Sequence, residues 1–497
     1  MKSLRSNSVA TVIQVVIFSV CQFVLYRFVT QMLGIEKLGL WSVVSSFTMA
    51  ASIGNFGASG SNVVMFVARY LSEDNLIKVK KVISTSLVFT AISTALILVI
   101  LYPIAIYFFS KMLSPAFFDL ASNKLIFLSF AHFMLYTISF LIWSVVDGYQ
   151  LYVKRVTFYS IAQILNLALS IVFMYLFDIE GLFWALIIQY GFLAFSGLWI
   201  VYHLIPFKMF FCKQTFKEIF NYGVKLQAIS LISTFSEPAI KYFLTKYGGL
   251  ATTGYYELAN KISNQVRNPI LVGLQPLIPA IAEIKDDENK NERIHAFFVS
   301  GTNHVFDINL FINYGFIFLL PLISYFWIGS LERTFISLTI GLSVGNFFNT
   351  LVSPINYINF GTGRLRGNII QQLFQSLITI ICIIVAFHVP DSISTLSFGL
   401  GLSVGIASLF IVYYFEKTIK IQVFNTYLSN SWRLAFLFLT YLIFFFLYKL
   451  FSLISLKYYV VITLVVVVVV TIVFYFFILS EKSKSVLLQF LNKSKAN

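Results

Sequence analysis

Charge is scarce in this sequence. Only 11% of its 497 residues are Asp, Glu, Lys or Arg, whereas 59% are hydrophobic and the mean hydropathy is +0.86. A soluble protein of this length needs far more polar surface, so the composition excludes soluble globular proteins. It predicts an all-α polytopic membrane protein.

Cysteine and the common catalytic motifs are also missing or rare. The three cysteines, Cys21, Cys212 and Cys382, lie far apart and follow no metal or redox spacing. The sequence contains neither a phosphate-binding G-x-x-x-x-G-K-[ST] loop nor an H-E-x-x-H pair. Every predicted loop is short, the longest running from about 282 to 299, so there is no room for a soluble domain. We therefore expect no enzyme activity, no metal and no cofactor.

Long apolar stretches dominate what is present, and about fourteen of them are long enough to cross a bilayer. They lie at about residues 9–31, 40–66, 83–109, 124–146, 155–177, 181–203, 222–246, 252–281, 299–327, 334–358, 367–388, 393–415, 432–452 and 457–479.

The distribution of Lys and Arg between the loops predicts the orientation of these spans. With a cytoplasmic N-terminus, the inner segments hold 23 basic residues, the outer segments hold 7, and five lie within spans. Cytoplasmic loops carry such an excess, so we expect both termini in the cytoplasm. This topology explains the net charge of +15, which lies against anionic lipid, and no nucleic-acid partner is expected.

An internal repeat divides the chain. Residues 27–41 and 242–256 align without a gap at an offset of 215 and share a Phe, a Thr, two Gly and a final aromatic residue. Both segments lie where an outward-running helix turns back. The repeat predicts two parallel six-helix lobes, 1–205 and 206–420, around a central cavity, with a helix pair and a basic tail at 421–497.

Ionisable residues interrupt several spans, and these predict the functional site. A charged group in hydrocarbon costs roughly 2.5–3.5 kcal/mol on insertion scales and persists where it faces a cavity or a partner. Arg27 and Arg267 have no carboxylate three or four residues away in the sequence. We expect these two cations to bind an anion, one from each lobe.

Two acid–base pairs lie nearby in the sequence. Glu237 precedes Lys241, and Glu257 precedes Lys261, at the i,i+4 spacing that brings side chains together on a helix. Either they are structural links between neighbouring helices or they belong to the cavity, where Lys241 and Lys261 would add to the cationic surface.

Three further polar residues complete the predicted cavity wall. Asn260 and Asn264 continue the polar stripe that holds Glu257 and Lys261. Asp307 fits a proton or cation site equally well as a partner for Arg267 or Lys261.

Several short motifs resemble one transporter family. They are Leu33–Trp41 at the first outer turn, Asn55–Ala58 with Val67–Tyr70 at the second span, and Gly254–Asn260 with Gln275–Ala280 at the eighth. Together with fourteen spans, they resemble the O-antigen (Wzx) flippases of the multidrug/oligosaccharidyl-lipid/polysaccharide exporter superfamily. Asn55 replaces the family's usual Asp, which puts a proton role there in doubt.

The resemblance implies the activity and the partners. It implies movement of an undecaprenyl-diphosphate-linked oligosaccharide, such as an O-antigen repeat unit, from the inner to the outer leaflet of the bacterial cytoplasmic membrane. A polysaccharide polymerase and a chain-length regulator are the implied protein partners. The cationic residues suit a diphosphate, and the Asn, Gln, Ser and Thr side chains suit sugars.

Three other functions remain open. A cation-coupled drug or metabolite antiporter of the same superfamily would favour acidic cavity residues, whereas the candidates here tilt cationic. A membrane-embedded polysaccharide polymerase, ligase or glycosyltransferase generally needs a sizeable outer loop, which this sequence lacks. A channel is disfavoured by the two-lobe plan.

Overall fold

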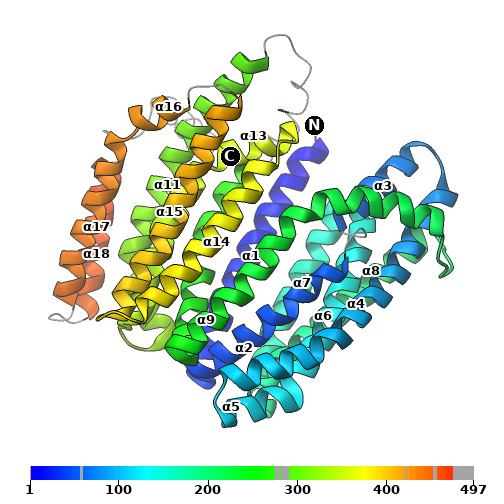
Figure 1. The fold of residues 1–497 in the computed structure, drawn as a ribbon, viewed down its shortest axis with the longest axis horizontal. Helices are drawn as coiled ribbons and strands as arrows, with labels where there is room; N and C mark the ends of the chain where they lie inside the picture. Colours follow the sequence, from blue (N-terminus) through cyan, green and yellow to red (C-terminus); the bar gives the residue numbers. More distant parts are fainter. Residues whose placement is uncertain are drawn as a thin grey trace. The chain divides into compact units, whose positions relative to one another are not determined.

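The protein is an array of long helices. The computed structural model describes residues 2–55, 60–274, 281, 290–419, 423–451 and 456–473, and this part of the chain is almost wholly helical, without a strand. Contacts within the chain divide it into two units, Met1–Glu257 and Leu258–Asn497. Figure 1 labels the helices along the chain. The all-α membrane class predicted from composition is therefore confirmed, whereas the lobe boundaries at 205 and 420 stay predictions.

The helices up to the middle of the chain are α1 (Lys2–Met32), α2 (Ile35–Met49), η1 (Ala50–Asn55), α3 (Gly60–Ser72), α4 (Leu76–Met112), α5 (Pro115–Leu120), the π-helical turn η2 (Ala121–Leu125), α6 (Ile126–Gly148), α7 (Tyr152–Phe177), α8 (Glu180–Leu204) and α9 (Lys213–Leu274). The later helices are α11 (Lys290–Ile328), α12 (Arg333–Leu351), α13 (Ser353–Thr362), α14 (Arg366–Ala386), α15 (Ser392–Ile419), α16 (Phe424–Ser429), α17 (Trp432–Phe451) and α18 (Leu456–Val473).

Within the described residues, helices lie at thirteen of the fourteen predicted spans, and the remaining one, 40–66, is interrupted. Nine helices of the described chain are long and apolar enough to cross a membrane, and α12 with α13 forms a tenth candidate that bends by 45°. Two further predicted spans, 222–246 and 252–281, lie on the two arms of α9, where polar residues lower the hydropathy. The last predicted span falls on α18, although its residues beyond 473 lie outside the described chain.

The predicted continuous span at 40–66 is wrong. The α-helical hydrogen bonding of α2 ends at Met49, residues 50–55 form a 3₁₀ helix, and α3 begins at Gly60. The 3₁₀ helix ends with Gly54 and Asn55, two residues of low helix propensity, so the apolar segment does not form one α-helix.

In the first unit, α6 lies at the centre of the core. It packs against α3, α4 and α8, and Trp143 is fully buried there. The indole Nε1 of Trp143 donates a hydrogen bond of 2.8 Å to the carbonyl of Leu193 on α8, which satisfies its one polar atom. The apolar core of this unit therefore holds α6 and α8 in a defined register.

In the second unit, small residues bring helices close together. α15 packs against α12 and α14. A side chain on Gly341 of α12 would collide with the backbone of Ser397 on α15, and Gly401 lies against the same glycine. Membrane helices use such small residues to gain close van der Waals contact without a hydrophobic driving force.

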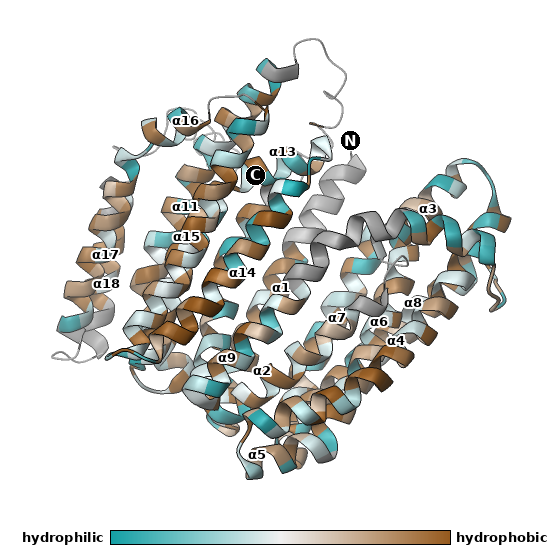
Figure 2. Ribbon diagram, in the orientation of Figure 1, coloured by the Kyte–Doolittle hydropathy of each residue, from teal (hydrophilic) through white to brown (hydrophobic). Residues whose placement is uncertain are grey.

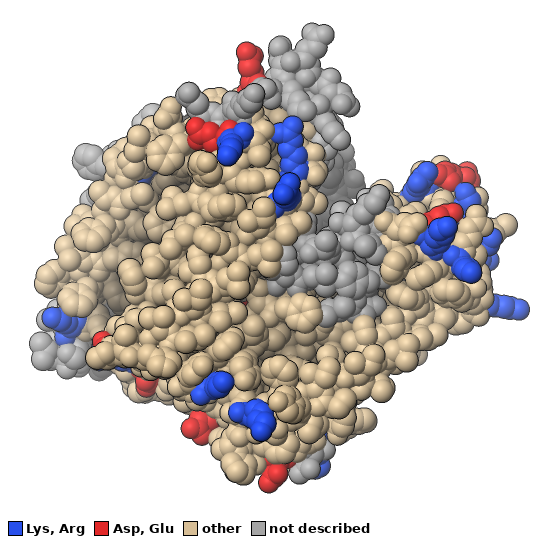
Figure 3. Space-filling model, viewed as in Figure 1, with Lys and Arg blue, Asp and Glu red and all other residues tan. Residues whose placement is uncertain are grey.

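Hydrophobic residues cover the surface between the helix ends. Figure 2 shows mostly hydrophobic residues along α4, α14 and α17. On the face drawn in Figure 3, the charged side chains of the described residues gather near the helix ends, with an uncharged stretch between them. This pattern matches a protein surrounded by hydrocarbon.

Some predicted features lie outside the described residues. They are Phe56–Ala58 and Gln275–Ala280 of the family motifs, residues 282–289 of the predicted loop, and the basic tail beyond residue 473. The rest of the loop predicted at 282–299 is helical instead, because α11 begins at Lys290. The orientation predicted from the loop charges and the cytoplasmic termini stay predictions.

Candidate functional site

The two segments of the sequence repeat form the same turn. Gly34, between α1 and α2, has φ 82° and ψ 170°. Gly249, which divides α9 into an arm at 213–248 and an arm at 250–274, has φ 79° and ψ 173°. Residues with a side chain essentially never adopt these backbone angles, which are found almost only in glycine. The repeat at an offset of 215 is therefore confirmed at this turn.

The two turns also pack against each other reciprocally. A side chain at Gly39 would collide with the backbone carbonyl of Leu250, and one at Gly254 would collide with the carbonyl of Ile35. Both pairs are related by the offset of 215, since Gly39 corresponds to Gly254 and Ile35 to Leu250. The contact thus has local two-fold symmetry, as in an isologous dimer interface.

A buried carboxylate lies next to this crossing. Glu257 is 3% exposed, and its Oε2 lies 2.8 Å from the Nζ of Lys241. The hydroxyl of Ser42 donates to the same oxygen over 2.8 Å, and the hydroxyl of Tyr26 donates to Oε1 over 3.1 Å. We call these four residues the Glu257 cluster.

The members of the Glu257 cluster are related by the same repeat. Tyr26 corresponds to Lys241, and Ser42 corresponds to Glu257, each at the offset of 215. The repeat therefore places four polar side chains at one point, two from α1 and α2 and two from the arms of α9. The two halves differ in charge, because an ion pair in one corresponds to two hydroxyls in the other.

The predicted pair of Glu237 and Lys241 is present. Their side chains approach to 3.2 Å, so Lys241, which is 5% exposed, contacts two carboxylates. Removal of Lys241 would leave the buried carboxylate of Glu257 without a counter-charge, which costs about 3–5 kcal/mol. The geometry fits a structural link, and a substrate role for Lys241 stays a prediction.

Arg267 has a different environment, in the second unit. One of its Nη2 hydrogens is donated to the side-chain oxygen of Asn349 on α12, whereas its buried Nε has no hydrogen-bond partner among the described residues. No carboxylate of the described chain forms an ion pair with it. Tyr357 of α13 lies near Arg267, and its hydroxyl donates a hydrogen bond of 2.9 Å to the backbone carbonyl of Leu271.

Three of the other predicted residues lie on the same arm of α9 as Arg267. Asn264 donates a side-chain hydrogen bond of 2.8 Å to Asn260, one turn earlier, and Lys261 lies beside them. All three are partly exposed, unlike the buried Ser263 on the next face of the helix. This arm therefore presents a polar face that runs from Asn260 to Arg267.

Arg27 lies on α1, directly after the buried Tyr26, and is partly exposed. It takes part in side-chain interactions in this structure. Its predicted role in binding an anion stays a prediction.

Asp307 has a partner that sequence reasoning did not name. Its Oδ1 accepts a hydrogen bond of 3.0 Å from the Nη1 of Arg433, the second residue of α17, and both side chains are buried. The partners we weighed, Arg267 and Lys261, lie on α9 instead. The contact links α11 to the C-terminal helix pair and fits a structural role.

Sequence reasoning also missed Ser42, Asn349 as the partner of Arg267, and Tyr357. The hydroxyl and amide groups of these residues gave no signal that separated them from many similar side chains. The repeat offset was a usable signal for Ser42, because adding 215 leads to Glu257.

The sequence matches a known family. A family model described as a polysaccharide biosynthesis protein matches residues 29–306, which is more than half of the chain. No curated protein matches the chain in sequence.

Solved transporter structures share the fold. An inward-facing multidrug resistance MATE family transporter of the MOP superfamily has a TM-score of 0.68 and 17% identity, over 81% of this chain and 94% of its own. The lipid II flippase MurJ, in an inward closed conformation, has a TM-score of 0.66 and 16% identity, over 94% and 97%. A MOP superfamily transporter from Pyrococcus furiosus has a TM-score of 0.58 and 16% identity, over 82% and 95%.

Proposed function

Because this chain belongs to the polysaccharide biosynthesis protein family, we propose that it is a flippase for lipid-linked oligosaccharides. It moves an undecaprenyl-diphosphate-linked repeat unit of O-antigen, or of a related surface polysaccharide, from the inner to the outer leaflet of the bacterial cytoplasmic membrane. The polyprenyl tail stays at the depth of the hydrocarbon core, and only the headgroup crosses through the interior of the protein.

The environment of Arg267 carries this proposal. A guanidinium inside a membrane span is costly, and this one has a neutral partner in Asn349 and a buried Nε–H that no described residue accepts. A planar guanidinium whose N–H donors are not all used within the protein is suited to a diphosphate, which accepts several charge-assisted hydrogen bonds. Asn260 and Asn264, on the same arm, supply amide groups of the kind that bind sugar hydroxyls.

The comparison of folds supports a flippase over a drug antiporter. The lipid II flippase covers 94% of this chain, against 81% for the MATE transporter, while the TM-scores are nearly equal. A lipid-linked substrate also agrees with the family description. The cation-coupled antiporter is therefore the second candidate, and an acidic coupling residue would favour it.

Alternating access provides the mechanism. The Glu257 cluster joins α1 and α2 to both arms of α9, at the turns that the predicted orientation places on the outer side. While these contacts hold, α1 and α2 stay bound to both arms of α9. Opening toward the outer leaflet requires Tyr26 and Ser42 to separate from Glu257, which returns a buried carboxylate to water.

Deletion of the gene tests the proposal. A cell without the protein is expected to accumulate completed lipid-linked repeat units on the cytoplasmic leaflet, and the wild-type gene restores export. Arg267→Ala is expected to insert and express yet fail to restore export, with Arg267→Lys partly active because the charge remains. Repeat units that accumulate on the outer leaflet instead would indicate a polymerase and overturn the proposal.

A further inference from the structure

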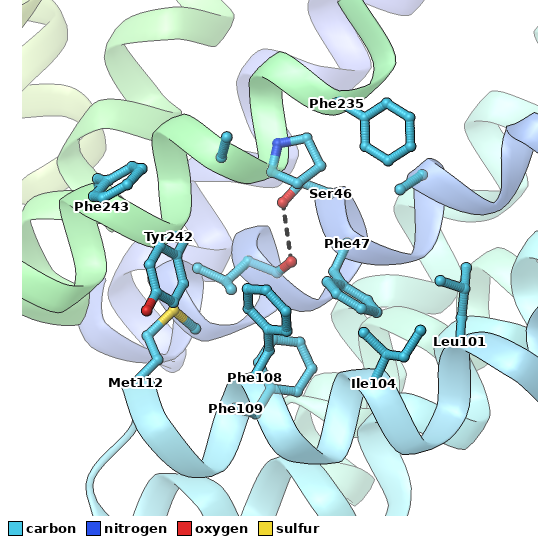
Figure 4. Close-up of a pocket in the computed structure, with 14 residues that line it drawn as sticks. Ser46, Phe47, Leu101, Ile104, Phe108, Phe109, Met112, Phe235, Tyr242 and Phe243 are labelled. Carbon is cyan, nitrogen blue, oxygen red and sulfur yellow. Dashed lines mark hydrogen bonds between the residues drawn. The ribbon is translucent and has the colours of Figure 1, made fainter. Parts of the chain in front are cut away.

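An apolar pocket of about 460 Å³ lies in the first unit, beside the Glu257 cluster. It is formed by α2, α4 and the first arm of α9 (Figure 4). We propose that it holds the polyisoprenoid tail of the lipid carrier in the outer leaflet, with the carrier's phosphate groups at Lys111 and Lys246. This inference rests on the proposed function, because it assigns a site to the lipid part of the same substrate.

Aromatic rings form the pocket wall. The rings of Phe47 on α2 and Phe108 on α4 lie 6.2 Å apart, and Phe108 meets Tyr242 of α9 edge-on at 5.5 Å (Figure 4). Phe47 also packs against Phe109 at 5.4 Å. Rings from three helices thus line one space, which suits a branched chain with double bonds better than a polar ligand.

The lining of the pocket offers almost no polar groups to a ligand. Ser46 is the one lining residue with an aliphatic hydroxyl, and that hydroxyl donates to the carbonyl of Val43 over 2.9 Å (Figure 4). A polar ligand would lose its hydrogen bonds to water here without gaining others. The lining therefore selects hydrocarbon.

The depth of the pocket agrees with a lipid tail. Its α4 wall runs from Leu101 to Met112, which is about 16 Å of helix, and Met112 is the last residue of α4. In the predicted orientation this wall lies in the outer half of a hydrocarbon core about 30 Å thick. Ile104, Phe108 and Phe235 are also 40% or more exposed, so the pocket opens where lipid chains lie.

Two cations lie where the pocket reaches the outer helix ends. Lys111 directly precedes the lining residue Met112. The ammonium of Lys246 lies 5.8 Å from the ring of the lining residue Tyr242. A ligand with an anionic headgroup and an apolar tail fits both the two lysines and the apolar lining. The lysines therefore favour a polyprenyl phosphate over an uncharged lipid.

The pocket shares its helices with the Glu257 cluster. Ser42 and Ser46 are one turn apart on α2, and Lys241 and Tyr242 are neighbours on α9. A tail held here is therefore bound by the same helices that separate when the outer side opens, so binding and opening are coupled.

Lipid retention measured by native mass spectrometry tests the site. The full-length protein is purified with added undecaprenyl diphosphate, and Ala239→Trp or Ile104→Trp fills the pocket from two different helices. Each is expected to lower retention about tenfold, since the lost apolar burial corresponds to about two methylene groups. Leu96→Trp, on the exposed surface of α4 and outside the pocket, is the matched control and is expected to retain the lipid.

Two further measurements identify the ligand. Lys246→Ala and Lys111→Ala are each expected to lower retention of undecaprenyl diphosphate roughly two- to fivefold, without changing retention of undecaprenol. Phosphatidylglycerol, offered in competition, is expected to displace little of the carrier lipid. Unchanged retention in both tryptophan variants, or equal displacement by phosphatidylglycerol, overturns the proposal.

Failure of this site and failure of the flippase function are distinguishable. Arg267→Ala is expected to keep the carrier lipid and lose translocation. If the tryptophan variants keep the lipid while Arg267→Ala still blocks export, the pocket inference fails and the function stands. If export never depends on the protein while the lipid is still retained, the function fails.

Discussion

Ser42 and Glu257, 215 residues apart, are joined by a hydrogen bond of 2.8 Å between the serine hydroxyl and the glutamate carboxylate. They occupy equivalent positions in the two copies of the repeat, so equivalent residues of the two copies contact each other. Lys241 and Tyr26, which are equivalent in the same way, bind the same carboxylate.

The first prediction concerns this carboxylate. Glu257→Gln replaces the carboxylate that accepts from Lys241, Tyr26 and Ser42 with a neutral amide, while Glu237 still balances Lys241. The variant is expected to lose about 1.5–3 kcal/mol of stability, because the charged hydrogen bonds are lost. Ser42→Ala removes one hydrogen bond to a charged group and is expected to cost about 1.5–3 kcal/mol. Thermal unfolding in detergent measures both.

Glu73→Gln is the control for this pair of variants. Glu73 forms an ion pair with Arg69 in which both side chains are exposed, and such a pair contributes about 0–1 kcal/mol. A midpoint for Glu257→Gln no lower than that for Glu73→Gln would show that the Glu257 cluster does not hold the turns together.

The second prediction follows from the symmetry of the crossing. Gly39→Ala and Gly254→Ala each place a methyl group against a backbone carbonyl that cannot move aside easily, at a cost of about 1–3 kcal/mol. The two losses are expected to be equal. In Gly191→Ala and Gly315→Ala the added methyl group would meet no neighbouring atom within 4 Å. These matched controls are therefore expected to be neutral or stabilising. Expression and unfolding midpoints measure the effect, and a large difference between the two crossing variants would contradict the symmetry.

The third prediction separates the charge of Arg267 from its packing. Asn349→Asp places a carboxylate against the guanidinium and nearly preserves the shape of the side chain. We expect a folded protein that no longer exports the repeat unit, because the ion pair competes with the diphosphate. Surface polysaccharide and protein level are measured together. Normal export by a stable Asn349→Asp protein is the result that this account cannot accommodate.

The fourth prediction decides between the roles of Asp307. Asp307→Asn leaves Arg433 as a buried, uncompensated charge and is expected to cost about 3–5 kcal/mol. The double variant Asp307→Asn, Arg433→Met removes both charges and is expected to regain stability and export. A stable double variant that does not export would show that Asp307 couples transport to an ion.

The sequence predicted the helices well because apolar runs of span length are a strong and local signal. It also located the turns at Gly34 and Gly249, since glycine pairs that recur at one offset mark special backbone geometry. It failed at 40–66, where the α-helix ends at Met49 and a 3₁₀ helix follows inside an apolar segment, which hydropathy alone does not reveal.

The contacts within the site were harder to predict. Glu257 and Lys241 lie 16 residues apart on opposite sides of a turn, and Asp307 meets Arg433 across 126 residues. The i,i+4 rule finds partners on one helix, such as Glu237 and Lys241, but gives no information about partners from other helices. Arg433, at the start of the predicted span 432–452, was counted among the basic residues of an inner segment and so gave no signal.

Translocation by purified protein tests the central claim most directly. The protein is reconstituted in liposomes that carry an undecaprenyl-diphosphate-linked oligosaccharide, and the accessibility of the glycan to an external glycosidase is followed. We predict that wild type and Arg69→Ala expose the glycan of the inner leaflet, whereas Arg267→Ala does not. Equal exposure in protein-free liposomes and in liposomes with wild type would contradict the account.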